Sequence, residues 1–292
     1  MNMSFRLLPR LILNRPWTQR DRRDHRPEMA QRWLSGAGLE IGALHKPTPV
    51  SPDASVAYVD YKTRQENERT YPELAAETIV ETHHVGDGFV LDFIPDGSQD
   101  FLIANHALEH SPNPWGTLEV WWSKLKPAGT LYVTVPVAEK CFDKGRPISR
   151  LADMLQDRRN FLALDREAAA QATERRFREF VTISDANIRR DNTMPPADPV
   201  GQAAFVEARM AALRQELQQA SSPAAMMTAH ITTINRVYDI HYHTFTPASF
   251  LRLGHAFCLS QGGRVADIRK SGGGEVIMIL RKLSHRPKFG RV

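Results

Sequence analysis

The turn over residues 271–274 (Ser-Gly-Gly-Gly) constrains the fold more than any other feature of the sequence. It joins two stretches with strand character, residues 264–270 and 275–280. A connection of four residues joins antiparallel neighbours, because a parallel pair needs a crossover of a dozen or more residues. The sequence therefore predicts a β-hairpin near the end of the chain, so a sheet that includes it contains at least one reversed strand.

The first half of the chain alternates short apolar strands with helices. One helix is predicted over residues 27–36, with Gly36 as its stop, and another over residues 114–125, before the break at Pro127. This alternation is typical of a parallel sheet covered on both faces. The predicted strands are residues 39–41, 55–60, 78–85, 100–105 and 130–135. With the hairpin, the expected fold class is α/β: a doubly wound, mostly parallel seven-stranded sheet with a terminal antiparallel hairpin.

Strand character is interrupted in the middle of the chain. Residues 148–220 are rich in Ala, Arg, Glu and Gln, and three prolines in residues 191–199 separate two helical stretches. A helical hairpin is expected, with an apolar stripe that packs against the sheet domain. The stripe recurs at helical spacing and consists of Val206, Met210, Leu213 and Leu217. The predicted domains are a basic tail (1–26), a sheet domain (27–136 and 244–282), a helical insert or lid (137–243) and a second basic tail (283–292).

Charge is distributed unevenly along the chain. The net charge of +5 at pH 7 combines +5 in residues 1–32 and +5 in residues 281–292 with −5 in the body between them. A body that grips nucleic acid normally carries a basic face of its own, so no nucleic-acid partner is expected. The basic ends are interpreted as solvated tails, and peripheral contact with an anionic membrane surface stays open as the alternative.

The sequence carries no signal for membrane insertion or secretion. No apolar run reaches the roughly 18 residues needed to cross a bilayer, and Pro9 and Arg10 interrupt the apolar stretch near the start. Cys141 and Cys258 form no CxxC pair, which excludes a cysteine-based structural zinc site and fits a reducing compartment. A cytoplasmic location is the resulting expectation.

Polar residues follow the first three predicted strands, at the edge where a doubly wound sheet binds ligands. Gly42 allows a tight turn after the first strand, and Glu40 presents a carboxylate there. Asp60 ends the second strand, where a carboxylate can accept hydrogen bonds from both hydroxyls of a ribose. Asp87, in the third crossover, can accept one from an adenine amino group. Each of these residues can instead be a turn or cap residue.

Taken in order, these segments resemble the class I S-adenosyl-L-methionine (SAM)-dependent methyltransferases, specifically the type 11 methyltransferase-domain group. The resemblance covers roughly residues 37–136 and 244–281 and is most specific over residues 94–136. That part contains the run Asp-Phe-Leu-Ile-Ala-Asn-His-Ala-Leu-Glu-His and a helix that ends in Leu-Lys-Pro-Ala-Gly. The resemblance implies a Rossmann-like methyltransferase fold, SAM as cofactor, and methyl transfer to a small-molecule or sugar-like (glycan) acceptor whose pocket the helical insert shapes.

The resemblance also implies roles for individual residues. It assigns cofactor binding to Glu40, Gly42, Ala43, Asp60, Tyr61, Asp87, Gly88 and Asn105. Leu44 and Lys46 stand where the family usually has its second and third glycines. This departure motivates an alternative, a non-catalytic protein of the same fold that binds a partner. It also disfavours an NAD-dependent enzyme, because the pyrophosphate of NAD needs the second glycine for close approach.

Histidines near the active edge are candidate bases for the acceptor, since methyl transfer needs a base only for a poorly ionised hydroxyl. The catalytic candidates are His106, His241 and His243, with His110 beside them. Arg146 either binds an anionic acceptor or pairs with Asp143 or another local acid.

No metal site is expected from the sequence. His106 and His110 are four positions apart, but no third ligand is evident and an HExxH pattern is absent. Glu109 and His110 are interpreted instead as residues that cap or brace the helix after them.

Overall fold

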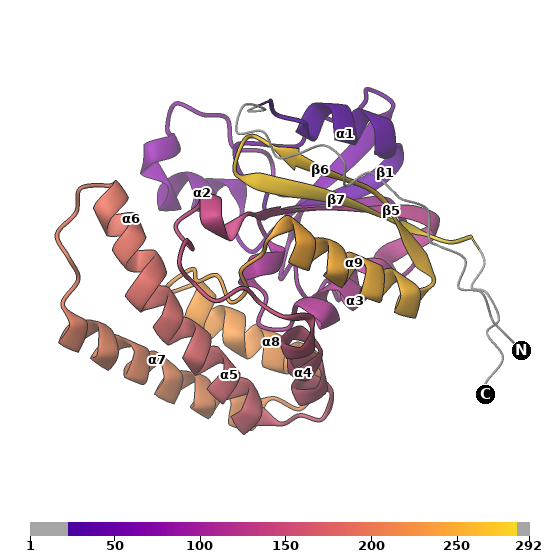
Figure 1. Cartoon of the computed structure of the whole chain (residues 1–292). Helices are drawn as coiled ribbons and strands as arrows, with labels where there is room; N and C mark the ends of the chain where they lie inside the picture. Colours follow the sequence, from indigo (N-terminus) through magenta and orange to yellow (C-terminus); the bar gives the residue numbers. More distant parts are fainter. Residues whose placement is uncertain (1–22, 285–292) are drawn as a thin grey trace, which may run out of the picture.

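The computed structural model describes residues 23–284, and within them the strands form one sheet (Figure 1). The strand order is β3-β2-β1-β4-β5-β7-β6. The pairings from β3 to β5 are parallel, whereas β7 runs antiparallel to β5 and β6. The strands are β1 (Gly36–Ile41), β2 (Ala54–Asp60), β3 (His84–Val85), β4 (Gln99–Asn105), β5 (Leu125–Pro136), β6 (Gly263–Ser271) and β7 (Glu275–Lys282). The predicted fold class, including the terminal hairpin, is confirmed.

Alternating side chains of the central strands make a core on each face of the sheet. Phe101 and Ile103 of β4 pack against α1 (Arg26–Trp33) on one face. Leu102 of β4 packs on the other face, which α3 (Pro114–Lys124) and α9 (Pro247–Gln261) cover. Each large apolar side chain that is fully buried stabilises the fold by about 1.5–3 kcal/mol. The parallel sheet is thus held between two helical layers, as the alternating pattern predicts.

Two local predictions were wrong at element boundaries. Of the strand predicted over residues 78–85, only the last two residues form a strand, because the Val80 N–H donates to the Leu44 carbonyl in the loop after β1 (2.9 Å). Gly36 does not stop α1, which ends at Trp33; it begins β1 with a φ of +83°. The Ala37 N–H next to it donates to the Asp100 carboxylate at 3.0 Å.

The insert is a larger helical unit than the predicted hairpin. The four residues of its apolar stripe are buried in a core that belongs to the insert itself, with Phe161, Phe177 and Met226, rather than against the sheet. This happens because α7 packs on α5 and α8, which supply enough apolar surface to enclose it. The helices are α4 (Leu151–Leu162), α5 (Arg166–Glu179), α6 (Asp185–Asp191), α7 (Pro199–Gln219) and α8 (Pro223–His230), with π-helical segments η4 (Phe180–Ser184) and η5 (Ile231–Asn235).

The insert leaves and re-enters the sheet domain at one place. Val137 and Phe245 form an isolated parallel bridge directly after β5. Helix α4 connects the two cores, since Met154 packs in the core of the sheet domain and Phe161 in that of the insert. The insert therefore lies beside the carboxyl ends of the parallel strands (Figure 1). The remaining short helices are α2 (Arg64–Thr70), η1 (Pro72–Leu74), η2 (Leu108–His110) and η3 (Ala138–Lys140).

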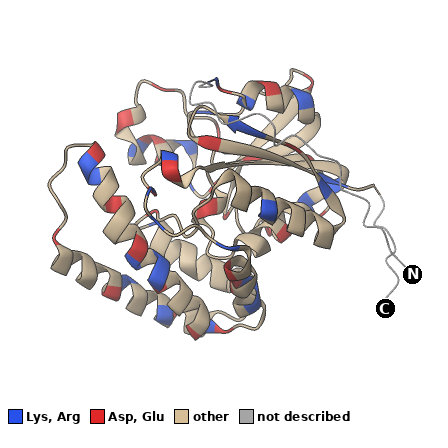
Figure 2. Cartoon of the chain, viewed as in Figure 1, with Lys and Arg blue, Asp and Glu red and all other residues tan. Residues whose placement is uncertain are grey.

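The inner ends of both predicted tails are bound to the sheet domain. The Gly272 N–H donates to the Arg23 carbonyl (3.0 Å), and the Leu283 N–H donates to the Gly262 carbonyl (3.1 Å). The rest of the tails, residues 1–22 and 285–292, lies outside the described residues. Between these limits, none of the helices is long and apolar enough to cross a membrane. In the view of Figure 2, basic and acidic residues are mixed along the helices of the insert.

Candidate functional site

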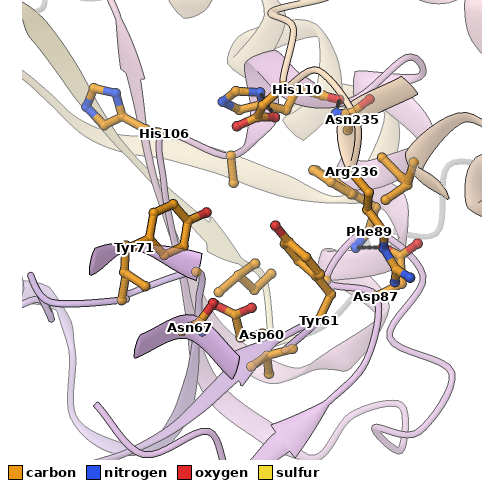
Figure 3. A pocket seen from close by; sticks show the side chains of 18 residues that line it. Asp60, Tyr61, Asn67, Tyr71, Asp87, Phe89, His106, His110, Asn235 and Arg236 are labelled. Atoms are coloured by element: carbon orange, nitrogen blue, oxygen red, sulfur yellow. Dashed lines mark hydrogen bonds and ion pairs between the residues drawn. The ribbon is translucent and has the colours of Figure 1, made fainter. Parts of the chain in front are cut away.

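A cavity lies where the carboxyl ends of β1 and β2 face the insert (Figure 3). Strands β1 and β4 are neighbours, with β2 on one side and β5 on the other, so this is where the strand order reverses and a doubly wound sheet binds ligands. We call Ile41, Gly42, Leu44, Val59, Asp60, Tyr61, Asp87, Gly88 and Phe89 the sheet-side wall. We call His106, Ala107, His110, Ile231, Asn235, Arg236 and Asp239 the insert-side wall. Asn67 and Tyr71, from α2 and its end, complete the lining.

The loop after β1 adopts left-handed backbone conformations even where it lacks glycine. Gly42 has a φ of +65°, and Leu44 a φ of +49°. For leucine this conformation costs roughly 1–2 kcal/mol. It persists because the Val80 N–H donates to the Leu44 carbonyl and the Gly42 N–H donates to the Val59 carbonyl, each at 2.9 Å. Leu44 thus supplies the turn that a glycine usually makes, with its side chain in the cavity lining.

Glu40 supports this loop from below and does not line the cavity. The residue is 1% exposed. Its carboxylate accepts hydrogen bonds from the Thr48 N–H (3.0 Å), the Thr48 hydroxyl (2.7 Å) and Asn105 Nδ2 (3.0 Å). Burial raises the pKa of Glu40, and these hydrogen bonds partly offset that rise. Glu40 and Asn105, which the resemblance assigns to cofactor binding, instead form a buried network that fixes the loop.

Asp60 faces the cavity from the end of β2. Its carboxylate accepts the Lys62 N–H at 3.0 Å, and burial raises its pKa. Beside it, the Tyr61 ring has the Lys62 ammonium and the Arg236 guanidinium each 5.1 Å from its centroid. The carboxylate is thus held in place with acceptor capacity left for a ligand.

Asp87 presents a buried acceptor without a partner. Its Oδ1 accepts the Phe89 N–H at 2.8 Å, whereas its Oδ2 has no hydrogen-bond partner among the described residues. Burial raises the pKa of Asp87. Gly88 next to it needs to be glycine, because a Cβ there would lie 2.5 Å from Cγ2 of Ile41. An unmade hydrogen bond of a buried carboxylate costs about 1–3 kcal/mol, so this oxygen is suited to a ligand donor.

His106 projects from the end of β4 in a strained conformation, with a φ of +49°. Its Nε2 lies 2.7 Å from Oε2 of Glu275, and Glu275 also pairs with Arg26. Burial alone would raise the pKa of Glu275, but the hydrogen bonds from His106 and Arg26 outweigh it and lower the pKa to about 2. An ionised carboxylate therefore orients the imidazole of His106 at the cavity.

Glu109, His110 and His241 form a cluster behind the insert-side wall. One nitrogen or oxygen atom from each lies within 4.8 Å of those of the other two. The rings of His110 and His241 meet edge to face, with their centroids 4.6 Å apart. The sequence predicts that Glu109 and His110 cap or brace α3; the capping part is wrong, because the Asn113 side chain caps that helix.

Asp143 holds His241 and Arg146 in a buried network. Its carboxylate accepts Arg146 Nη1 (2.8 Å) and the Ser184 hydroxyl (2.7 Å) through Oδ1, and binds Nδ1 of His241 through Oδ2 (2.5 Å). Burial opposes ionisation, but His241 and Arg146 together lower the pKa of Asp143 to about 2. Arg146 therefore takes the second of its two predicted roles, pairing with Asp143, and does not line the cavity.

His243 also lies outside the cavity. It is fully buried, its Nδ1 lies 3.1 Å from the Ser149 hydroxyl, and its Nε2 lies 3.5 Å from Oδ2 of Asp157. Burial lowers the pKa of His243 well below its usual range, so the ring is neutral. Its contacts are those of a packed structural residue rather than of a base that reaches an acceptor.

The cavity brings together about half of the residues predicted from the sequence. Of these, Gly42, Asp60, Tyr61, Asp87, Gly88 and His106 line it, whereas Glu40, Ala43, Asn105, Arg146, His241 and His243 do not. Sequence reasoning missed Asn67, Tyr71, Phe89, Asn235, Arg236 and Asp239. No local pattern marks them, except that Asp239 lies two positions before His241.

No protein-family model matches the sequence, and no curated protein matches it. Among solved structures, the chain is similar to a SAM-dependent methyltransferase from Aquifex aeolicus (10% identity, 88% of this chain and 89% of that chain, TM-score 0.40). It is also similar to a provisionally assigned methyltransferase from Bacillus halodurans (13% identity, 88% of this chain and 97% of that chain, TM-score 0.34). A third similar structure is a provisionally assigned zinc-dependent alcohol dehydrogenase from Rhodobacter sphaeroides (12% identity, 89% of this chain and 90% of that chain, TM-score 0.43). At TM-scores below 0.5 these similarities do not bear on activity.

Proposed function

We propose that this chain is a SAM-dependent methyltransferase of the type 11 group that binds its cofactor against the sheet-side wall. The observation that carries the proposal is the pair of carboxylates Asp60 and Asp87 at adjacent strand ends, the latter with a buried oxygen that lacks a donor. A nucleoside offers the matching donors, because its ribose has two hydroxyls and its adenine an exocyclic amino group. The apolar side chains of Ile41, Val59 and Phe89 line the same wall and suit the adenine ring.

The residues of the loop after β1 fit the remainder of the cofactor. Gly42 and Leu44 turn the backbone at the cavity. No atom of the described residues lies within 4 Å of the Cβ position of Gly42, so a ligand can approach the backbone closely. SAM supplies a methyl carbon that its sulfonium already activates. The work left to the protein is therefore to position the acceptor and to exclude water.

The insert-side wall is the proposed acceptor site. It offers the polar side chains of Asn235, Arg236 and Asp239, a set that suits a small-molecule or sugar-like acceptor with several hydroxyls. Asn235 ends η5, Arg236 follows it directly, and Asp239 lies four positions beyond its end; π-helical segments occur frequently at functional sites. His106, oriented by Glu275, is the proposed base for an acceptor hydroxyl. We place the activity in the cytoplasm, and membrane contact through the tails stays a prediction.

The proposal is tested by calorimetry with S-adenosylhomocysteine (SAH) and with S-inosylhomocysteine, which replaces the exocyclic amino group by a carbonyl. We expect the protein to bind SAH roughly 10- to 100-fold more tightly, since a lost or mismatched hydrogen bond to a buried charged group costs about 1–3 kcal/mol. Asp87→Asn should remove this preference, because an amide can donate to the carbonyl of the analogue. If neither compound binds, or if the wild-type protein binds both equally, the proposal is wrong.

A further inference from the structure

We propose that Glu109, His110 and His241 bind one divalent transition-metal ion, such as Zn²⁺, behind the insert-side wall. Two imidazoles and one carboxylate are an established ligand set for zinc and for non-haem iron. Mg²⁺ and Ca²⁺ take oxygen ligands instead, so the two histidines favour a transition metal. This site is separate from the proposed cofactor contacts and replaces the sequence-based expectation that no metal is bound.

Two segments that are distant in the sequence bring these ligands together. Helix η2 presents Glu109 and His110, and the irregular segment before α9 presents His241. The Glu109 carbonyl accepts the N–H groups of Tyr242 (2.8 Å) and His243 (3.1 Å), which fastens the two segments side by side. The third ligand, His241, thus lies at the end of the insert in the sequence, whereas Glu109 and His110 precede the insert. This explains why no local sequence motif contains all three ligands.

The Glu109 carboxylate is the strongest sign that a cation belongs here. Its side chain is fully buried, and neither oxygen has a hydrogen-bond partner among the described residues. Outside the cluster, Nδ1 of His106 lies 3.7 Å from Oε1 of Glu109, which is beyond hydrogen-bond distance. A buried ionised carboxylate normally pairs with a cation or coordinates a metal. Glu109 therefore has capacity for a strong ligand bond that the protein itself does not use.

Both histidines have the second hydrogen bond that is typical of metal ligands. Nδ1 of His241 binds Asp143 (2.5 Å), and Nδ1 of His110 lies 3.0 Å from the Ile240 carbonyl and 2.9 Å from Oδ1 of Asp239. Such bonds fix the tautomer and leave Nε2 as the metal-binding atom. Ligand atoms around one zinc ion lie about 3.3 Å apart at bond lengths of about 2.0–2.1 Å. Small shifts of these side chains therefore suffice to close the site around an ion.

The competing explanation is a protonated His110 that neutralises Glu109 without any metal. It uses the same residues but predicts different behaviour, because a proton needs no third ligand and leaves His241 uninvolved. The metal explanation instead gives a role to all three side chains and to the Asp143 carboxylate behind His241. Because His110 also lines the cavity, a bound ion would lie next to the proposed acceptor site.

The experiment is a Zn²⁺ titration of the untagged full-length protein after treatment with a chelator and dialysis. Calorimetry and elemental analysis should give one ion per chain. Glu109→Gln and His241→Gln should each lower the Zn²⁺ affinity more than about 100-fold, since even loss of a second-shell partner costs about 10- to 100-fold. His255→Gln, which changes an exposed histidine on α9, is the matched control and should leave the affinity unchanged.

A second measurement keeps the proposal falsifiable if a variant fails to fold. Co²⁺ added to the wild-type protein should give visible absorption bands of a four- or five-coordinate site, and Zn²⁺ should abolish them. The proposal is overturned if the wild-type protein binds no stoichiometric Zn²⁺ or Co²⁺. It is also overturned if folded Glu109→Gln and His241→Gln bind Zn²⁺ as tightly as His255→Gln does.

Discussion

The two walls of the cavity present carboxylates in opposite situations. On the sheet-side wall, Asp60 and Asp87 each accept a backbone N–H and keep acceptor capacity directed at a ligand. Behind the insert-side wall, Glu109 lies fully buried beside imidazoles, and within residues 23–284 no group donates a hydrogen bond to its carboxylate. The first arrangement suits the neutral hydroxyl and amino donors of a nucleoside, and the second suits a cation. Residue type alone therefore does not determine what a carboxylate binds; its partners and burial do.

The largest effect is expected from removing Asp143, which anchors the insert-side wall. Asp143→Ala leaves the buried Arg146 guanidinium unpaired, and breaking a buried pair in this way costs about 3–5 kcal/mol. Urea unfolding followed by circular dichroism measures the loss. Asp153→Ala removes an ion pair to the exposed Arg150 and should cost less than about 1 kcal/mol. Equal losses in the two variants would contradict the buried network.

Glu275, which pairs with His106 of the insert-side wall, gives a prediction about how stability depends on pH. Its folded-state pKa of about 2 lies below the ordinary value of 4.5. Its stabilisation is therefore present above about pH 4.5 and is lost as the pH falls towards 2. Glu275→Gln should lower the free energy of unfolding at pH 7 by on the order of 2 kcal/mol and should flatten its decrease between these pH values. Parallel pH profiles of variant and wild type would be inconsistent with this role.

A substitution of Asp60 tests the sheet-side wall through its effect on SAH affinity rather than on the stability of the protein. Asp60→Ala should weaken SAH binding about 10- to 100-fold, because hydrogen bonds to a charged group contribute about 1.5–3 kcal/mol each. The thermal midpoint of the apoprotein should change little. Asp53→Ala alters an exposed acid in the loop before β2 and serves as the control. Calorimetry that finds the two variants equal in SAH affinity would remove Asp60 from the site.

The smallest effect is expected at Gly42, where backbone strain and ligand contact can be separated. Gly42 and Gly97 have φ values of +65° and +64°, and in the part of the chain that the structure describes no atom lies within 4 Å of either Cβ position. Either glycine changed to alanine should cost about 1 kcal/mol of stability. Only Gly42→Ala places its methyl group in the cavity, so it alone should weaken SAH binding. Equal SAH affinities of the two variants would show that the ligand does not approach Gly42.

The sequence predicts the sheet-side wall much better than the insert-side wall, for a physical reason. Asp60 and Gly42 follow apolar strands, and strand ends meet at one edge of a parallel sheet, so local patterns suffice to place them. Leu44 takes a left-handed conformation that its residue type disfavours. The loop is held there because the Leu44 carbonyl accepts the Val80 N–H from the segment before β3, and the Gly42 N–H donates to the Val59 carbonyl of β2.

The insert-side wall depends on tertiary contacts that no local pattern records. Glu109 and His241 come together through backbone and side-chain hydrogen bonds between η2 and the segment before α9. Arg236 and Asn235 reach the cavity because the insert folds around its own core and directs η5 towards the sheet. Helical periodicity indicates that such a core exists but not which other helices enclose it.

Native mass spectrometry with SAH and Zn²⁺ added together tests the difference between the two walls most directly. The wild-type protein should gain the mass of one SAH and one Zn²⁺. Asp60→Ala should lose SAH and retain Zn²⁺, whereas Glu109→Gln should lose Zn²⁺ and retain SAH. If the wild-type protein gains neither mass, or if both variants lose the same one, the assignment of an organic cofactor to one wall and a metal ion to the other is wrong.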